Sequence, residues 1–169
     1  MGRTILNFAY GSNLLPARLH GRAPSAQAVA TGAVAGHVLR WHKRGRDGSG
    51  KCALAASGAS EAGWGVVSAL DAGDKRALDR AEGLGAGYRE VAVEVRTAQG
   101  PLVALAYQAA AGATDPALQP YDWYRALVLA GARHHQLPPG WITALERVAV
   151  MRDPDRQRAA RFAGLLAGA

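Results

Sequence analysis

Cysteine is nearly absent from this chain: Cys52 is the single one among 169 residues. One thiol cannot form an internal disulfide, which is typical of proteins from a reducing compartment. Long apolar runs are also missing, since no stretch approaches the ~20 residues that a membrane-spanning helix needs. The N-terminus has no charged segment followed by a long apolar one, as a signal peptide would have. The sequence therefore predicts a cytoplasmic protein without a membrane partner.

Groupings that would hold a metal or form a covalent catalytic centre are scarce as well. No histidine, cysteine or carboxylate cluster has metal-ligand spacing, and the adjacent His134 and His135 would point in different directions on a helix. Ser12 lacks the G-x-S-x-G pattern of a hydrolase nucleophile. Residues 45–52 read G-R-D-G-S-G-K-C, but a P-loop needs Ser or Thr in the last position and a helix after it. A strand is expected there instead, so the residues predict neither a P-loop nucleotide site nor a metal site.

Basic residues outnumber acidic ones by 20 to 13, which gives a net charge of +7. They are dispersed except within residues 37–51 and 152–161. No recognition-helix, zinc-finger or aromatic RNA-binding pattern accompanies them. We therefore expect no nucleic-acid partner, and we expect the arginines near the C-terminus to form a solvated helix face. A basic field also favours small anionic substrates.

The chain is long enough, and with 49% hydrophobic residues apolar enough, for one globular domain. Its many alanines and glycines suggest a source with a GC-rich genome, as in many bacteria. Trp123 and Trp141 could belong to the core or to a homodimer interface. Residues 1–150 are expected to form the domain, and residues 151–169 a C-terminal helical extension that crosses the sheet or stays mobile.

Strand patterns dominate the first two thirds of the chain and helical patterns the last third. This order indicates an α+β domain built on a mostly antiparallel, curved sheet. The expected strands are 4–10, 26–43 (one long strand, or two joined at Gly32 or Gly36), 51–56, 63–70, 88–97 and 102–108, and the expected helices are 14–19, 72–81, 121–136, 141–148 and 155–166.

Residues 8–14 read F-A-Y-G-S-N-L, a short apolar strand that runs into a polar turn. Gly11 lets the backbone turn sharply without a Cβ clash. Ser12 and Asn13 are good helix N-cap residues, and a short helix with Pro16 in its first turn is expected to follow. Such a junction leaves several main-chain N–H groups pointing into one space, where they can bind an anion or a developing oxyanion. This turn is the first candidate for a functional site.

Glu82 is the carboxylate that stands apart from the others. It follows the helix predicted over residues 72–81, directly before Gly83, and its immediate neighbours carry no charge. Asp79 lies one helical turn earlier, so the two carboxylates are expected to be close. A carboxylate at an apolar helix end can be desolvated, which suits it to general acid–base work. The other interpretation is a surface residue before a C-capping glycine, and on the residues alone both stay open.

Several segments, taken together, resemble the γ-glutamylcyclotransferase family. They occur in the family's order, and they span residues 7–138 of the chain. A single Y-G-S-N would be unspecific, but its combination with an acidic E-G and a later Tyr–Gly-Ala–Leu-Pro pattern is specific. The segments are F-A-Y-G-S-N-L at 8–14, W-G-V-V at 64–67, L-D-R-A-E-G at 78–83, G-Y-R at 87–89, and Tyr124 with Gly-Ala at 131–132 and Leu-Pro at 137–138.

The resemblance implies a small β-barrel with flanking helices, and an enzyme that needs neither a metal nor an organic cofactor. In the family's reaction the α-amine of a γ-glutamyl group attacks its own γ-carbonyl. This closes a five-membered lactam, 5-oxoproline, and releases an amino acid or an amine. Glu82 takes the position of the family's catalytic glutamate, which moves the proton. The substrate-binding positions that the resemblance implies are Tyr10, Gly11, Ser12, Asn13, Leu14, Tyr107 and Tyr124, although the last two could equally be core tyrosines.

The expected partner is a small γ-glutamyl compound, but the leaving group stays open between an amino acid, a peptide such as glutathione, and an amine. The chain length and the long region 26–56 resemble the enzymes that act on γ-glutamyl amino acids. The basic segment 42–51 is the natural place for specificity, where Lys43, Arg46 or Lys51 could meet the carboxylate of the departing amino acid. Because one fold hosts many functions, a non-catalytic domain that only binds a γ-glutamyl or other anionic ligand is the alternative.

Overall fold

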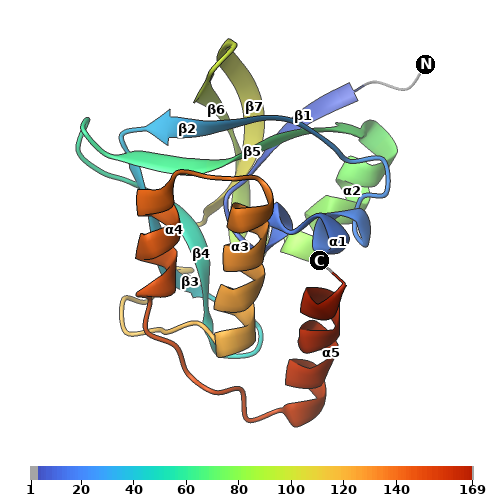
Figure 1. Ribbon diagram of the computed structural model, residues 1–169, viewed down its shortest axis with the longest axis vertical. Coiled ribbons are helices and arrows are strands. Elements are labelled where there is room, and N and C mark those ends of the chain that lie inside the picture. The colour runs from blue at the N-terminus through green and yellow to red at the C-terminus, as the bar shows by residue number, and fades with distance from the viewer. Residues whose placement is uncertain (1–3, 169) are drawn as a thin grey trace.

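A closed five-stranded barrel forms the centre of the molecule (Figure 1). The structure is a computed structural model that describes residues 4–168, so residues 1–3 of the expected domain and residue 169 of the expected extension lie outside it. All neighbouring strands are antiparallel except β7 and β1, whose parallel pairing closes the barrel. The mixed, mostly antiparallel barrel is therefore confirmed. In spatial order the strands are β1 (Thr4–Ala9), β5 (Ala62–Asp71), β2 (Gln27–Ala35), β6 (Tyr88–Thr97) and β7 (Gly100–Ala109).

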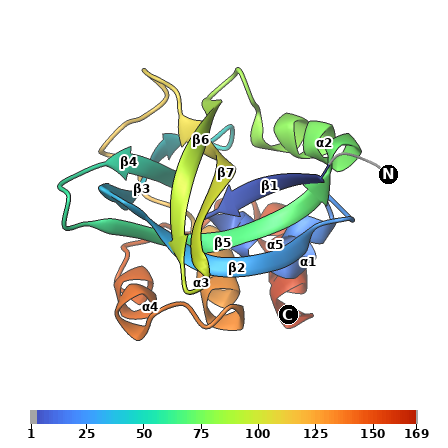
Figure 2. The same cartoon turned by 90° about the horizontal axis from the view of Figure 1, so that it is seen from above.

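A separate two-stranded sheet and several helices flank the barrel, as Figure 2 shows from above. The small sheet pairs β3 (His37–Arg44) with β4 (Gly50–Ala56). No helix in residues 4–168 is both long enough and apolar enough to cross a membrane. The helices are a 3-10 turn η1 (Ser12–Leu14), α1 (Pro16–His20), α2 (Ala72–Glu82), α3 (Asp122–His134), α4 (Pro139–Glu146) and α5 (Arg156–Ala167).

The region predicted as one long strand, or two, is divided at Gly36. This glycine has φ +67°, a left-handed conformation that side chains disfavour, and the chain leaves the barrel there to enter the small sheet. Gly32, the other predicted junction, lies inside β2. A Cβ at Gly32 would come 2.5 Å from the carbonyl oxygen of Arg96 on β6. Its role is therefore close strand packing.

The C-terminal helix α5 packs against α3 through two aromatic rings. Phe162 stacks on Trp123 with a centroid separation of 3.9 Å and an interplanar angle of 12°. Both side chains are buried, and Trp141 is partly buried against the same core. Asp155 caps the helix by accepting a hydrogen bond from the Arg158 main-chain N–H at 2.9 Å. Trp123 is therefore a core residue, and α5 has a defined position beside α3.

We expect Phe162→Ala to lower the free energy of unfolding by about 3–5 kcal/mol, because it removes a buried aromatic ring and leaves a cavity beside Trp123. Chemical denaturation followed by tryptophan fluorescence measures the change. Gln157→Ala, on the exposed side of the same helix, is the control and should have little effect. An equally small effect of both substitutions would show that α5 does not depend on this stack.

Candidate active site

The carboxylate of Glu82 is held by two polar side chains from a distant part of the sequence. Helix α2 ends at Glu82 because Gly83 follows with φ +73° as its left-handed C-cap. The Asn13 amide Nδ2 donates to Glu82 Oε1 at 2.9 Å, and Arg22 forms an ion pair with the same oxygen. Arg22 also donates to Asn13 Oδ1 at 2.7 Å. The predicted apolar surroundings of Glu82 are thus wrong, because Arg22 reaches it from the segment between α1 and β2.

The side chains of the turn after β1 make tertiary contacts and do not cap a helix. The predicted N-cap bonds are absent at η1 and α1, whose N-caps are Gly11 and Leu15. The Ser12 hydroxyl accepts a hydrogen bond from Arg18 Nε at 2.9 Å. The Asn13 amide is occupied by its contacts at the α2 terminus. These tertiary contacts take up the two side chains that the sequence assigned to capping.

The main-chain N–H groups of Gly11, Ser12 and Asn13 have no hydrogen-bond acceptor within residues 4–168. The N–H of Leu14 is different, since it donates to the Gly11 carbonyl at 2.9 Å. The Leu14 side chain is buried against Gly131 of α3, where an added Cβ would come 2.4 Å from the Leu14 backbone. The predicted substrate-binding role of the Leu14 amide is therefore not supported, and the other three N–H groups remain as donors.

A cavity lies between this turn and Glu82, and four tyrosines line it: Tyr10, Tyr88, Tyr107 and Tyr124. Tyr10 donates its hydroxyl hydrogen to the Tyr107 carbonyl, and Tyr107 donates its own to Asp79 Oδ1 at 2.6 Å. Burial raises the pKa of Tyr10, so its hydroxyl stays neutral. Asp79, one turn from Glu82 as predicted, therefore positions Tyr107. The hydroxyls of Tyr10 and Tyr107 are already occupied by protein partners.

The other two tyrosines hold the backbone of Cys52 on β4. Tyr88 donates to the Cys52 carbonyl at 2.7 Å, and the Cys52 N–H donates to the Tyr124 hydroxyl oxygen at 3.2 Å. The sequence left open whether Tyr107 and Tyr124 are pocket or core residues. Both side chains are buried, and both line the cavity. Tyr88, which belongs to the family-like segment at residues 87–89, lines the cavity as well.

Asn7 on β1 is a polar side chain in the cavity lining that sequence reasoning missed. Its side chain is buried, with 1% exposure, and neither Nδ2 nor Oδ1 has a hydrogen-bond partner within residues 4–168. A buried carboxamide without partners costs free energy and calls for an explanation. The available signal was an asparagine inside an otherwise apolar strand. Arg22 was missed as well, and no local pattern marks it.

A second, wider hollow adjoins the cavity, and we call it the outer chamber. It shares Ser12, Glu82, Tyr88 and Tyr124 with the cavity. Basic side chains from both basic segments of the sequence line it. The prediction that the C-terminal arginines only form a solvated face is wrong for Arg158, which is partly buried and paired with Asp153, whereas Arg161 is exposed as well as lining the chamber. The basic lining residues are Arg18, Arg22, Lys43, Arg46, Lys51, Arg158 and Arg161.

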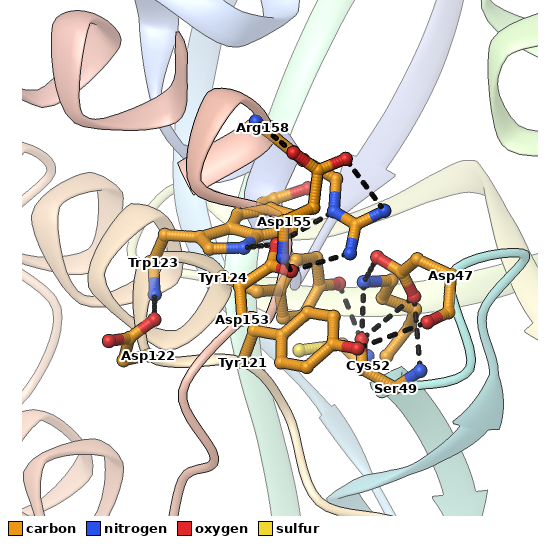
Figure 3. Close-up of polar contacts among 12 residues, drawn as sticks. Asp47, Ser49, Cys52, Tyr121, Asp122, Trp123, Tyr124, Asp153, Asp155 and Arg158 are labelled. Atoms are coloured by element: carbon orange, nitrogen blue, oxygen red, sulfur yellow. Dashed lines mark hydrogen bonds and ion pairs between the residues drawn. The ribbon is translucent and has the colours of Figure 1, made fainter. Parts of the chain in front are cut away.

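Part of the outer chamber is fixed by a network of hydrogen bonds and ion pairs (Figure 3). Asp153 accepts hydrogen bonds from Trp123 Nε1 and Arg158 Nε, each at 2.7 Å. The hydrogen bond from Arg158 lowers the pKa of Asp153 to about 2. Lys51 pairs with Asp47 at 2.7 Å. Arg158 and Lys51 therefore have structural roles, because their ion pairs hold the wall of the chamber in place.

Two other features of the sequence have structural roles. Residues 45–52 form the connection between β3 and β4 and the start of β4, so a strand follows the glycine-rich segment, as predicted. His135, at the end of α3, donates a hydrogen bond to the Leu14 carbonyl at 3.1 Å. Within residues 4–168 no group of three or more potential ligands could hold a metal ion.

Sequence comparison relates this chain to known proteins. A family model described as AIG2-like matches residues 63–145. A γ-glutamylcyclotransferase from Bos taurus is 30% identical over 143 residues, covering 81% of this chain and 74% of that protein. One from Mus musculus is 28% identical over 160 residues, covering 87% and 80%. The chain belongs to the γ-glutamylcyclotransferase family, which is a family of enzymes. These mammalian relatives do not bear out the bacterial source that the composition suggested.

The fold of this family member also has a close counterpart among solved structures. A structure described as a γ-glutamyl cyclotransferase superposes with a TM-score of 0.88, covering 99% of this chain and 100% of that one, at 23% identity. The superposition includes helix α5, because nearly the whole chain is covered. The matched family segment, residues 63–145, contains Glu82 and three of the cavity tyrosines, whereas the turn after β1 precedes it.

Cys52 lines the cavity but cannot act as a nucleophile in this state. Burial raises the pKa of its thiol to about 12, and the side chain is 1% exposed. We expect the native protein to resist labelling by Ellman's reagent at neutral pH, and to release one equivalent of the thiolate dye once unfolded in guanidinium. Rapid labelling of the native protein would show that the cavity opens far enough to expose the sulfur.

Proposed function

We propose that this family member cyclises a γ-glutamyl amino acid to 5-oxoproline, with Glu82 as the general acid and base. The nitrogen of the substrate's α-amine attacks its γ-carbonyl carbon, and a five-membered lactam forms. The bond from that carbon to the leaving nitrogen breaks. One proton passes from the attacking amine to the leaving nitrogen through Glu82, so no water is consumed.

The observation that carries this proposal is the asymmetric binding of the Glu82 carboxylate. Asn13 and Arg22 both donate to Oε1, whereas Oε2 has no hydrogen-bond partner within residues 4–168. Oε1 therefore orients the carboxylate, and Oε2 is the oxygen available to accept and return a proton. Because Glu82 lines the cavity, Oε2 can serve a substrate bound there.

The turn after β1 supplies the donors that the reaction needs. The free N–H groups of Gly11, Ser12 and Asn13 can donate hydrogen bonds to a negatively charged oxygen. That oxygen is either the γ-carbonyl oxygen in the transition state or an oxygen of the substrate carboxylate. The Ser12 hydroxyl already accepts a bond from Arg18. We assign the binding role to the backbone and no nucleophilic role to this serine.

The cavity also favours the folded substrate that cyclisation requires. Its tyrosine walls are fixed by hydrogen bonds to the backbone and to Asp79, so they do not need to be ordered when the substrate binds. A fixed wall that holds the amine against the γ-carbonyl lowers the entropic part of the activation barrier, because the substrate loses its conformational freedom when it binds. At the cavity wall, the Asn7 carboxamide offers a donor and an acceptor to the α-carboxylate and α-amine of the γ-glutamyl group.

The leaving group would lie in the outer chamber, where cations favour a carboxylate. This favours a γ-glutamyl amino acid or peptide, including glutathione, over a γ-glutamyl amine, whose leaving group has no carboxylate. Of the three cations that the sequence suggested, Lys51 is paired with Asp47, so Lys43 and Arg46 are the better candidates. Release of 5-oxoproline would connect the protein with glutathione metabolism in the cytoplasm, and the single buried thiol supports such a compartment.

We expect Glu82→Gln to lower the rate of 5-oxoproline release from γ-glutamyl-alanine by at least ~100-fold, as the loss of a general base does. Chromatographic detection of 5-oxoproline measures turnover, and circular dichroism checks the fold. Glu94→Gln, an exposed glutamate on β6, is the matched control and should keep full activity.

Turnover that survives Glu82→Gln would remove this residue from the mechanism. A wild-type protein that binds γ-glutamyl-alanine, γ-glutamyl amines and glutathione, yet returns them all unchanged after long incubation, would favour the non-catalytic binding domain.

We expect Asn7→Leu to change stability and activity in opposite directions. Removing a buried amide without partners should raise the free energy of unfolding by about 1 kcal/mol, while loss of a substrate contact should lower kcat/KM by about tenfold. Thermal denaturation and 5-oxoproline release measure the two effects. Gln27→Leu, at an exposed polar position on β2, controls for added hydrophobicity. A variant that loses stability would contradict the interpretation that this amide serves the substrate rather than the fold.

A further inference from the structure

The outer chamber holds more positive charge than one carboxylate requires. Seven cationic side chains line it, together with only two carboxylates, Asp47 and Glu82. Three of the cations have acidic partners: Arg22 with Glu82, Lys51 with Asp47, and Arg158 with Asp153. The other four have no carboxylate at ion-pair distance within the described part of the chain, and they are Arg18, Lys43, Arg46 and Arg161.

Two of these unpaired cations adjoin the same aromatic ring. The guanidinium carbons of Arg18 and Arg161 lie 4.9 and 4.8 Å from the centroid of Phe162. In Figure 1 helix α1, which carries Arg18, lies above the C-terminal end of α5, which carries Arg161. The Nε of Arg18 donates to Ser12, and its terminal nitrogens have no partner within residues 4–168. Both guanidinium groups therefore border the part of the outer chamber that Phe162 lines.

The second pair of unpaired cations, Lys43 and Arg46, lies in another part of the chamber lining, close to Glu82. A Cβ on Gly83, the neighbour of Glu82, would be 3.4 Å from Nη2 of Arg46. The ammonium of Lys43 lies 4.5 Å from the centroid of the Tyr88 ring. Both come from β3 and the connection after it, whereas the first pair comes from helices.

Like charges held near one another in this way repel one another. Burial lowers the pKa of Arg18 to about 10, and the neighbouring Arg22 and Arg161 act in the same direction. Burial also lowers the pKa of Lys43; Glu82 opposes this shift, and Arg46 adds to it. An anionic ligand would reduce the repulsion between the cations of each pair. The chamber therefore favours ligands that carry negative charge.

We propose that the outer chamber selects substrates whose leaving group is an acidic amino acid, such as γ-glutamyl-glutamate or γ-glutamyl-aspartate. One pair of cations binds the α-carboxylate of the leaving amino acid, and the other pair binds its side-chain carboxylate. Helix α5 is then a specificity element, because it contributes Arg161 and Phe162. This inference rests on the proposed cyclisation for one point only, namely that the leaving group of the substrate lies in the outer chamber. The charge preference of the chamber is a binding property and does not depend on the reaction.

The test compares γ-glutamyl-glutamate with γ-glutamyl-glutamine, two dipeptides of nearly the same shape that differ by one carboxylate. We expect kcat/KM to be at least tenfold higher for γ-glutamyl-glutamate at low ionic strength, and the ratio to fall as sodium chloride is added. Arg161→Gln should reduce the ratio severalfold through KM, while Arg161→Lys should retain most of it. Arg156→Gln, an exposed arginine on the same helix outside the chamber, should leave the ratio unchanged.

Calorimetric binding of both dipeptides to the Glu82→Gln variant separates this proposal from the proposed reaction. If wild-type protein cyclises neither dipeptide, the reaction is wrong, and the ratio of the two dissociation constants still decides the preference. Tighter binding of γ-glutamyl-glutamate that Arg161→Gln weakens supports an acidic leaving group. Equal kcat/KM and equal dissociation constants for the two dipeptides would overturn it.

Discussion

The contact of Glu82 with Asn13 and Arg22 is the interaction on which the site depends. It joins the end of α2 to the turn after β1. The antiparallel register places the end of β5 beside the start of β1, and α2 then runs back so that its last residue reaches the turn after β1. A partly buried carboxylate without its cation would be costly, so each partner stabilises the position of the other. The same contact leaves Oε2 of Glu82 without a hydrogen-bond partner within residues 4–168. The interaction that stabilises this junction therefore also leaves one carboxylate oxygen available for chemistry.

Closure of the barrel supplies the rest of the cavity. The parallel pairing of β1 with β7 brings Tyr10, just beyond β1, to the backbone of Tyr107 near the end of β7. Tyr107 in turn contacts Asp79 on α2, so one chain of hydrogen bonds crosses from the barrel to the helix that carries Glu82. An open sheet would leave β1 and β7 apart. Closure of the barrel thus fixes the walls of the cavity.

The local features of this site could be predicted from the sequence, whereas its long-range partners could not. The strand, the turn at Gly11 and the end of α2 at Gly83 follow from hydrophobic periodicity and glycine conformation, and the role of Glu82 followed from the family resemblance. Arg22 carries no local signal, because its importance arises from a contact with a segment far away in the sequence. Asn7 is marked only as an asparagine inside a mostly apolar strand, and that pattern does not say what the side chain faces. The N-cap prediction for Ser12 and Asn13 failed for the same reason: tertiary partners compete for the side chains that would cap a helix.

The positive charge of the chain acquires a different meaning once it is placed in three dimensions. In sequence, two separate basic segments are equally compatible with a solvated surface, and the helix that carries Arg158 and Arg161 reads as an accessory. Packing of Phe162 on Trp123 turns that helix toward α1, and the two basic segments then face one chamber beside Glu82. A protein gains no stability from unpaired cations held near one another, since their repulsion opposes folding. The position of these cations beside Glu82 therefore supports the proposal that the leaving group carries negative charge.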